Sequence, residues 1–257
     1  MLTLFLIATA FAAAPPPTST WDPAEAEQVQ LELIEVLIDS KQPDKALYAI
    51  TQVRAGGMTG ADLDILQARA LVAKALPMDA ILLLENQYMR NYQRHKVMCL
   101  AHMDLKETDE AELNCRKALR FAPGTLSSID VADLHNNLGF VLASQNRHEE
   151  AIHSYREALK LSPNLTRARN NMGFSQAALG QDETALNTFR SALSASLGFD
   201  PEILEAEAHF NLGVAQLARG ADQQAKGSFH TALKHVPGHA NARDALDQMT
   251  PNLKEAP

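Results

Sequence analysis

The sequence predicts an all-α fold made of repeated helix pairs, and three observations support it. Apolar residues recur at spacings of three and four, without the alternation of a strand or a pair of β-branched runs joined by a hairpin turn. The stretch HNNLGFVLA, which begins at His135, returns as RNNMGFSQA from Arg169 and as HFNLGVAQL from His209. Each copy is followed by a phrase similar to EEAIHSYREALKLSP. Self-similarity at a spacing of this size indicates a helical repeat.

The chain of 257 residues begins with an apolar run from Leu2 to Ala14. Such a run is too short to span a bilayer of about 30 Å, but it suits the core of a signal peptide. We therefore expect residues 1–14 to be a signal peptide and the protein to be exported, to the periplasm of a bacterium, with no integral membrane span after cleavage. No Lys or Arg precedes the run, so an uncleaved apolar tail or the end of a longer leader is the alternative. Residues 15–21, rich in Pro, Thr and Ser, have the composition of a linker.

The folded part should begin near Asp22 and Pro23, an N-cap residue followed by a good first helical residue. From there we expect about six helix pairs. The expected segments are two divergent pairs over 22–91, four regular repeats at 92–125, 132–165, 166–199 and 206–239, a capping helix at 240–250 and a disordered tail at 251–257.

Two repeats are longer than the others. The spacing between equivalent alanines is 40 residues from Ala111 to Ala151 and again from Ala185 to Ala225. The extra residues contain helix-start chemistry, namely SSID from Ser127 and DPE from Asp200. The first helix of each of these units should therefore start one to two turns early. The added turns either contact a partner or are insertions without a role.

Each regular unit combines small and large residues in a fixed order. In the most regular unit, Gly139 on the first helix and Ala151 and Ala158 on the second let the two helices approach, and Tyr155 fills the space beside them. Pro163 then ends the second helix. This accounts for a glycine inside a predicted helix.

The pattern resembles that of tetratricopeptide repeat (TPR) proteins. The matching residues are Gly139, Gly173, Gly213, Ala151, Ala185, Ala225, Tyr155, Phe189, Phe229, Ala158, Ala192, Ala232, Pro163 and Pro237. The resemblance implies a right-handed α-solenoid whose first helices line a concave groove. Where the family prefers Trp, this chain has His95, His135 and His209.

The resemblance also implies a peptide-binding groove. Asparagine amides offer two donors and an acceptor, which match an extended peptide backbone without reading its sequence. The alternative is that these amides tie adjacent helices together, and that the phenylalanines belong to the core between repeats. The predicted groove residues are Asn136, Asn137, Phe140, Arg167, Asn170, Asn171, Phe174, Phe210 and Asn211.

Other classes of function find no support in the sequence. The net charge is −8 and no Lys/Arg cluster is present, so nucleic acid is not an expected partner. We find no motif of a catalytic site and expect no catalytic residues and no cofactor. The nine histidines share no spacing that closes a metal site, so no metal is expected. Cys99 and Cys115 occupy facing slots of one unit, where they form either a disulfide or two buried thiols.

The sequence thus predicts a non-enzymatic scaffold that binds an extended segment of a protein partner. By resemblance, such a scaffold would serve assembly of a cell-envelope complex of the pilus or secretion type. Two alternatives stay open: a purely architectural or oligomerising repeat protein, and an accessory subunit of an envelope enzyme.

Overall fold

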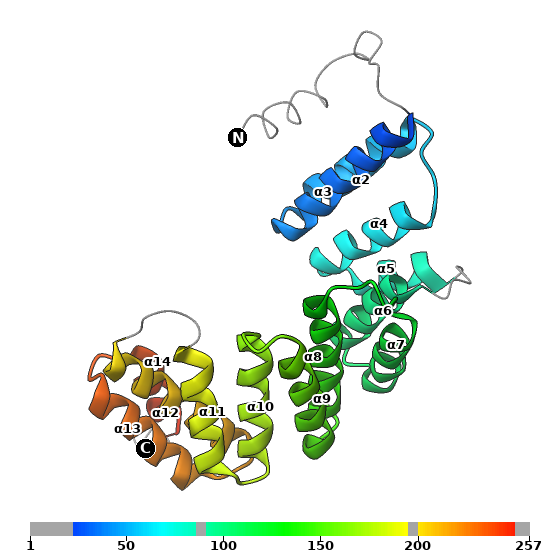
Figure 1. Cartoon of the computed structure of the whole chain (residues 1–257). Coiled ribbons are helices and arrows are strands. Elements are labelled where there is room, and N and C mark those ends of the chain that lie inside the picture. The colour runs from blue at the N-terminus through cyan, green and yellow to red at the C-terminus, as the bar shows by residue number, and fades with distance from the viewer. Residues whose placement is uncertain (1–22, 86–90, 195–199, 250–257) are drawn as a thin grey trace, which may run out of the picture. The chain divides into compact units, whose positions relative to one another are not determined.

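The computed structural model describes residues 23–85, 91–194 and 200–249, and these residues form α-helices without a strand (Figure 1). The helices are α2 (Pro23–Asp39), α3 (Pro43–Ala55), α4 (Ala61–Ala73), α5 (Pro77–Glu85), α6 (Tyr92–Asp104), α7 (Thr108–Phe121), α8 (Ser128–Ser144), α9 (His148–Leu161), α10 (Thr166–Ala178), α11 (Asp182–Ser194), α12 (Pro201–Ala218), α13 (Asp222–His235) and α14 (Ala240–Met249). The all-α prediction is confirmed. None of the helices in these ranges combines the length and hydrophobicity that crossing a membrane requires.

The chain divides into two compact units, residues 1–114 and 115–257, which are described separately. In the first unit, α2 packs on α3 and α4 packs on α5, and α4 also contacts α2 and α6. In the second unit, α8 packs on α9, α10 on α11 and α12 on α13, while α14 covers α13. Within the two units, α2 and α3, α4 and α5, α8 and α9, α10 and α11, and α12 and α13 thus pack as pairs of consecutive helices. The predicted leader, linker and C-terminal tail lie outside the described residues.

The two long helices of the second unit start early, as predicted. Ser127 Oγ accepts a hydrogen bond from the backbone N–H of Asp130 at the start of α8, and Asp200 Oδ1 accepts one from Glu202 N–H at the start of α12. Pro201 is the first residue of α12. These caps satisfy backbone donors that have no partner inside the helix, and each adds a turn to the first helix of its pair.

Each first helix of a pair ends in a turn that contains one residue with positive φ. In the second unit these residues are Asn146, Gly180 and Gly220, with φ of 60°, 76° and 79°. At the first of them, Asn146 N–H donates to Ala143 O and Arg147 N–H to Leu142 O, at 3.0 and 2.9 Å. This is the Schellman pattern, which satisfies carbonyls at a helix end. It reverses the chain tightly enough for the second helix to pack back on the first.

Close packing in three helix pairs of the second unit depends on the predicted glycines. A Cβ placed on Gly139, Gly173 or Gly213 would lie 2.6, 2.6 and 2.5 Å from an aromatic ring atom of the paired helix. These rings belong to Tyr155, Phe189 and Phe229, which are buried. Because the glycines lack a side chain, the first helix lies directly against the ring.

Candidate functional site

A cavity of about 750 Å³ opens along the first helices of the second unit. Helix α10 contacts both α8 and α12, so the C-terminal halves of these three helices lie side by side. The residues that line the cavity are Phe140, Ala143, Ser144, Asn146, His148, Tyr155, Asn171, Phe174, Ser175, Ala178, Ala215, Ala218 and Arg219. Three of the predicted groove residues, Phe140, Asn171 and Phe174, are among them.

The two phenylalanines of the cavity have different surroundings. Phe140 on α8 is 48% exposed, which is unusual for a large apolar side chain. Phe174 on α10 is half-buried and packs edge-on against Phe189, with ring centroids 5.1 Å apart. The Phe140 ring is therefore available to contact a ligand. The Phe174 ring belongs both to the cavity wall and to the core between α10 and α11.

The predicted asparagine ladder has a staggered arrangement. Asn171 Nδ2 donates to Asn136 Oδ1 at 3.2 Å, and Asn211 Nδ2 donates to Asn170 Oδ1 at 3.4 Å. The second asparagine of one repeat thus bonds to the first asparagine of the preceding repeat. Asn136 is only 4% exposed, and its amide also lies 3.4 Å from Asn137 Oδ1.

These hydrogen bonds join α8 to α10 and α10 to α12, which is the structural alternative that the sequence left open. They do not use every donor and acceptor of the amides, since each side chain offers two N–H groups and a carbonyl oxygen. Of the asparagines in the ladder, only Asn171 also lines the cavity. It is therefore the amide best placed to contact a bound chain.

Two other predicted residues lie away from the cavity. Arg167, at the start of α10, is exposed and forms an ion pair with Asp133 of α8. Phe210 of α12 packs between Phe229 and His239, with ring centroids 5.8 and 5.2 Å away. Phe210 is thus part of the core under the capping helix α14.

Arg219 is a cavity residue that the sequence did not single out. Its guanidinium donates to both carboxylate oxygens of Asp182, at 2.7 and 3.0 Å, and to Gln224 Oε1 at 2.7 Å. Gln216 Nε2 also donates to Asp182, at 2.6 Å. Burial tends to raise the pKa of Asp182, but the hydrogen bonds from Arg219 and Gln216 outweigh it and hold that pKa below its usual value. The carboxylate stays ionised and fixes the arginine beside the cavity.

Two other polar side chains, Tyr155 and His148, line the cavity. Burial raises the pKa of the Tyr155 hydroxyl, so Tyr155 is a neutral group at physiological pH. His148, at the start of α9, has a buried Nδ1 without a hydrogen-bond partner among the described residues. A buried polar atom of this kind gains free energy from a ligand that supplies the missing hydrogen bond.

His95 and the two cysteines lie in buried positions of α6 and α7. His95, in the slot where the resemblance places Trp, is buried, and its Nδ1 lies 3.0 Å from Asn114 Oδ1. Cys99 and Cys115 are both buried, and the chain contains no free cysteine.

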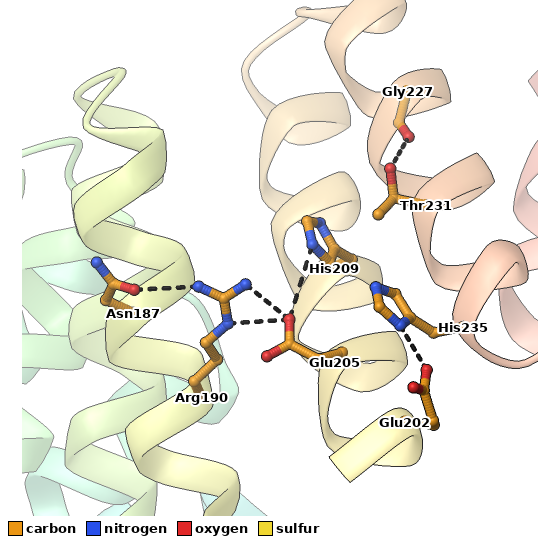
Figure 2. A network of polar contacts seen from close by, with 8 residues as sticks. All are labelled: Asn187, Arg190, Glu202, Glu205, His209, Gly227, Thr231 and His235. Atoms are coloured by element: carbon orange, nitrogen blue, oxygen red, sulfur yellow. Dashed lines mark hydrogen bonds and ion pairs between the residues drawn. The ribbon is translucent and has the colours of Figure 1, made fainter.

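Three side chains that do not line the cavity form a mixed cluster. Glu205 and His209 lie one turn apart on α12, and His235 reaches them from α13 (Figure 2). One potential ligand atom from each lies within 4.8 Å of the other two. Sequence reasoning missed this group because His235 comes from a different helix, and no sequence spacing signals that contact.

Comparison with known proteins agrees with this architecture. The family model of the tetratricopeptide repeat matches residues 132–165, which comprise α8 from its second turn onward, α9 and the adjoining turns. No curated protein sequence matches the chain. Several solved structures share its fold at low sequence identity.

Three of these structures cover most of the chain. YrrB, a TPR protein with an unusual peptide-binding site, is 23% identical over 77% of this chain and 98% of its own, with a TM-score of 0.54. PilF of Pseudomonas aeruginosa is 14% identical over 88% and 98%, with a TM-score of 0.63. A Rap protein complexed with competence and sporulation factor is 16% identical over 88% and 70%, with a TM-score of 0.61. At this level of identity the similarities establish the fold.

Proposed function

We propose that this TPR protein is a non-enzymatic scaffold that binds an extended segment of a protein partner along α8, α10 and α12. One observation carries the proposal: the cavity between these helices combines an exposed Phe140, the amide of Asn171 and the cation of Arg219. A large apolar side chain supplies affinity, and the amide supplies hydrogen bonds to a peptide backbone whatever its sequence.

The cavity has the size and composition of a binding site. Its volume of about 750 Å³ lies within the range of roughly 300–1,000 Å³ that is usual for ligand pockets. Most of its lining side chains are apolar or small, and a few polar groups converge on it, among them Arg219 and the unsatisfied Nδ1 of His148. The peptide-binding site of YrrB and the peptide factor bound to the Rap protein are consistent with this use of the fold.

Peptide binding is tested with the purified full chain and a display library of random linear peptides. Enriched peptides are labelled, and their affinity is measured by fluorescence anisotropy. We expect Phe140→Ala and Asn171→Ala each to weaken binding about tenfold, because each removes a contact worth roughly 1–2 kcal/mol. Leu161→Ala, which truncates an exposed leucine on α9, is the matched control.

Two results would contradict the proposal that a peptide binds in this cavity. One is the absence of any enriched peptide, and the other is equal loss of affinity in Leu161→Ala and Phe140→Ala. In either case the architectural or oligomerising alternative would be preferred, and sedimentation of the purified chain would measure self-association directly.

We assign the scaffold to assembly of a cell-envelope complex, on the basis of the apolar run from Leu2 to Ala14 and the TPR resemblance. Expression with the native N-terminus in a bacterium tests the export step. Mature protein recovered from the periplasmic fraction should begin after Ala10, Ala12 or Ala14, as measured by intact mass. An unprocessed chain found only in the cytoplasm would remove the envelope assignment but leave peptide binding in place.

A photo-crosslinking amino acid at position 140 tests the partner in its native setting. It should capture a protein that the same reagent at position 161 does not capture. Co-purification of an enzymatic activity with the captured protein would support the accessory-subunit alternative.

A further inference from the structure

We propose that Glu205, His209 and His235 bind a divalent transition-metal ion of the zinc type. The site lies between α12 and α13, outside the cavity between the first helices. It depends on the juxtaposition of two imidazoles and a carboxylate, which are among the preferred ligands of Zn²⁺.

The backbone already places these ligands on adjacent turns and adjacent helices. Glu205 and His209 are four residues apart on α12, so their side chains project from the same face. His209 Nε2 lies 4.0 Å from Glu205 Oε2. The His209 and His235 rings are nearly parallel, with an interplanar angle of 12° and centroids 6.1 Å apart.

Only a small contraction converts this arrangement into a coordination site. Ligand atoms held at about 2.0–2.1 Å from a tetrahedral Zn²⁺ lie roughly 3.3 Å from one another. In this chain the three ligand atoms lie within 4.8 Å of one another. Side-chain rotations that shift each ligand atom by about 1 Å are therefore sufficient, and the helices do not have to move.

Glu202 prepares His235 for metal binding. His235 Nδ1 lies 2.6 Å from Glu202 Oε2, one turn before Glu205 on α12. When the carboxylate accepts a hydrogen bond from Nδ1–H, the proton stays on Nδ1 and Nε2 keeps its lone pair. Figure 2 shows this second ring nitrogen turned toward His209. A carboxylate that orients a histidine ligand in this way is a regular companion of metal sites.

Arg190 on α11 carries a positive charge that works against metal binding at Glu205. Its guanidinium donates from Nε and Nη2 to Glu205 Oε2, at 3.0 and 2.6 Å (Figure 2). A cation bound by Glu205 would share the carboxylate with this positive charge, which weakens binding. Glu205 Oε2 is also the oxygen that lies 4.0 Å from His209 Nε2, so the metal and the arginine compete for the same oxygen.

Metal binding is tested by titrating the full chain, without an affinity tag, with Co²⁺ and then with Zn²⁺. Co²⁺ in a four-coordinate site gives strong visible absorption, which reports the geometry directly. We expect one equivalent of Co²⁺ to produce this spectrum and one equivalent of Zn²⁺ to abolish it. Zn²⁺ affinity is then measured by competition with a chromophoric chelator.

Variants identify the ligands. His235→Gln and Glu205→Gln should each lower the Zn²⁺ affinity at least tenfold and remove the Co²⁺ spectrum. His230→Gln, an exposed histidine on the same helix as His235, is the matched control and should change neither. Circular dichroism shows whether each variant keeps its helices.

Two further variants test the roles of the neighbours. Glu202→Ala should lower the affinity about tenfold, while Glu202→Gln, which keeps an oxygen acceptor for Nδ1–H, should restore most of it. Arg190→Gln should raise the affinity about threefold or more, because it removes the competing charge. The proposal is overturned if wild type shows no four-coordinate Co²⁺ spectrum, or if His230→Gln lowers the affinity as much as His235→Gln.

Discussion

The ring of Tyr155 occupies the place where a side chain on Gly139 would begin, because a Cβ there would lie 2.6 Å from Tyr155 Cε1. No Cβ tolerates so short a distance without movement of its neighbour. The ring is buried and cannot move away without opening the space between α8 and α9. The close approach of the two helices of a repeat is thus encoded by two residues, a glycine without a side chain and an aromatic residue with a large one.

Replacement of Gly139 by alanine should destabilise the protein. We expect the free energy of unfolding to fall by about 1–3 kcal/mol, which is the usual cost of overpacking a core. Gly227, inside α13, is the matched control, because a Cβ there would meet nothing within 4 Å. Gly227→Ala should raise the stability by about 1 kcal/mol through helix propensity alone. Urea unfolding followed by circular dichroism measures both, and equal effects of the two substitutions would refute the packing argument.

The turn after α4 offers a stabilising substitution. Ala75 is exposed and has a φ of 61°, which strains a residue that carries a Cβ. Ala75→Gly should therefore stabilise the chain by about 1 kcal/mol. Gly180, at the equivalent turn after α10, has a φ of 76°, so Gly180→Ala should have the opposite effect. Thermal unfolding midpoints that shift in the same direction for both variants would contradict this account.

Asp182 should make stability depend on acid pH. Its pKa is lower in the folded chain than in the unfolded chain, so its contribution is fully present above the unfolded value of about 3.9 and is lost as pH falls through the folded value. Asp182→Asn should cost about 1–2 kcal/mol at neutral pH and progressively less below about pH 4. Asp222→Asn, at the exposed equivalent position of α13, is the control. A cost of Asp182→Asn that is constant from pH 7 to pH 3 would exclude this linkage.

The amide pair between α8 and α10 should show energetic coupling. Asn171 donates to Asn136, which is buried, so either alanine variant leaves an unsatisfied group. A double-mutant cycle should give a coupling of about 0.5–1.5 kcal/mol in the free energy of unfolding. If the effects of the two alanine substitutions on the free energy of unfolding are additive instead, the hydrogen bond has no structural role. The Asn171 amide would then be free to serve only ligand binding.

Cys99 and Cys115 should be oxidised in protein from an oxidising compartment. Alkylation before reduction should leave the intact mass unchanged, and alkylation after reduction should add two labels. Closing a loop of about 17 residues stabilises a chain by roughly 3 kcal/mol on the chain-entropy model, so reduction should lower the unfolding midpoint. Two labels without reductant would show that both cysteines are thiols.

Sequence reasoning succeeds where the signal is local. The early starts of α8 and α12 follow from a serine and an aspartate that cap the backbone a few residues away. The turns between paired helices are harder to predict from the sequence. Their positive-φ position is held by Lys41, Ala75, Lys106 and Asn146 as well as by two glycines. At such a position the repeat context overrides the preference of the residue itself.

The candidate site could be predicted only in part. Phe140, Asn171 and Phe174, which the repeat pattern predicts to lie in a groove, are among the residues that line the cavity. Phe210, which occupies the position of Asn170 in the preceding repeat, packs under α14 instead, because the last repeat is covered by this helix. Arg219 carries no sequence signal, since its position beside the cavity depends on Asp182, which lies on another helix.

By itself, the sequence determined the helices, their pairing and the glycine–aromatic contacts. These properties depend on periodicity and on partners inside one repeat, so each copy of the motif carries the full information. Only the tertiary structure decided which asparagine bonds to which, that Arg219 lies beside the cavity, and that His235 meets Glu205 and His209. Such contacts depend on how each helix is rotated about its axis against its neighbours. That rotation results from packing along the whole length of the helices, and no single motif specifies it.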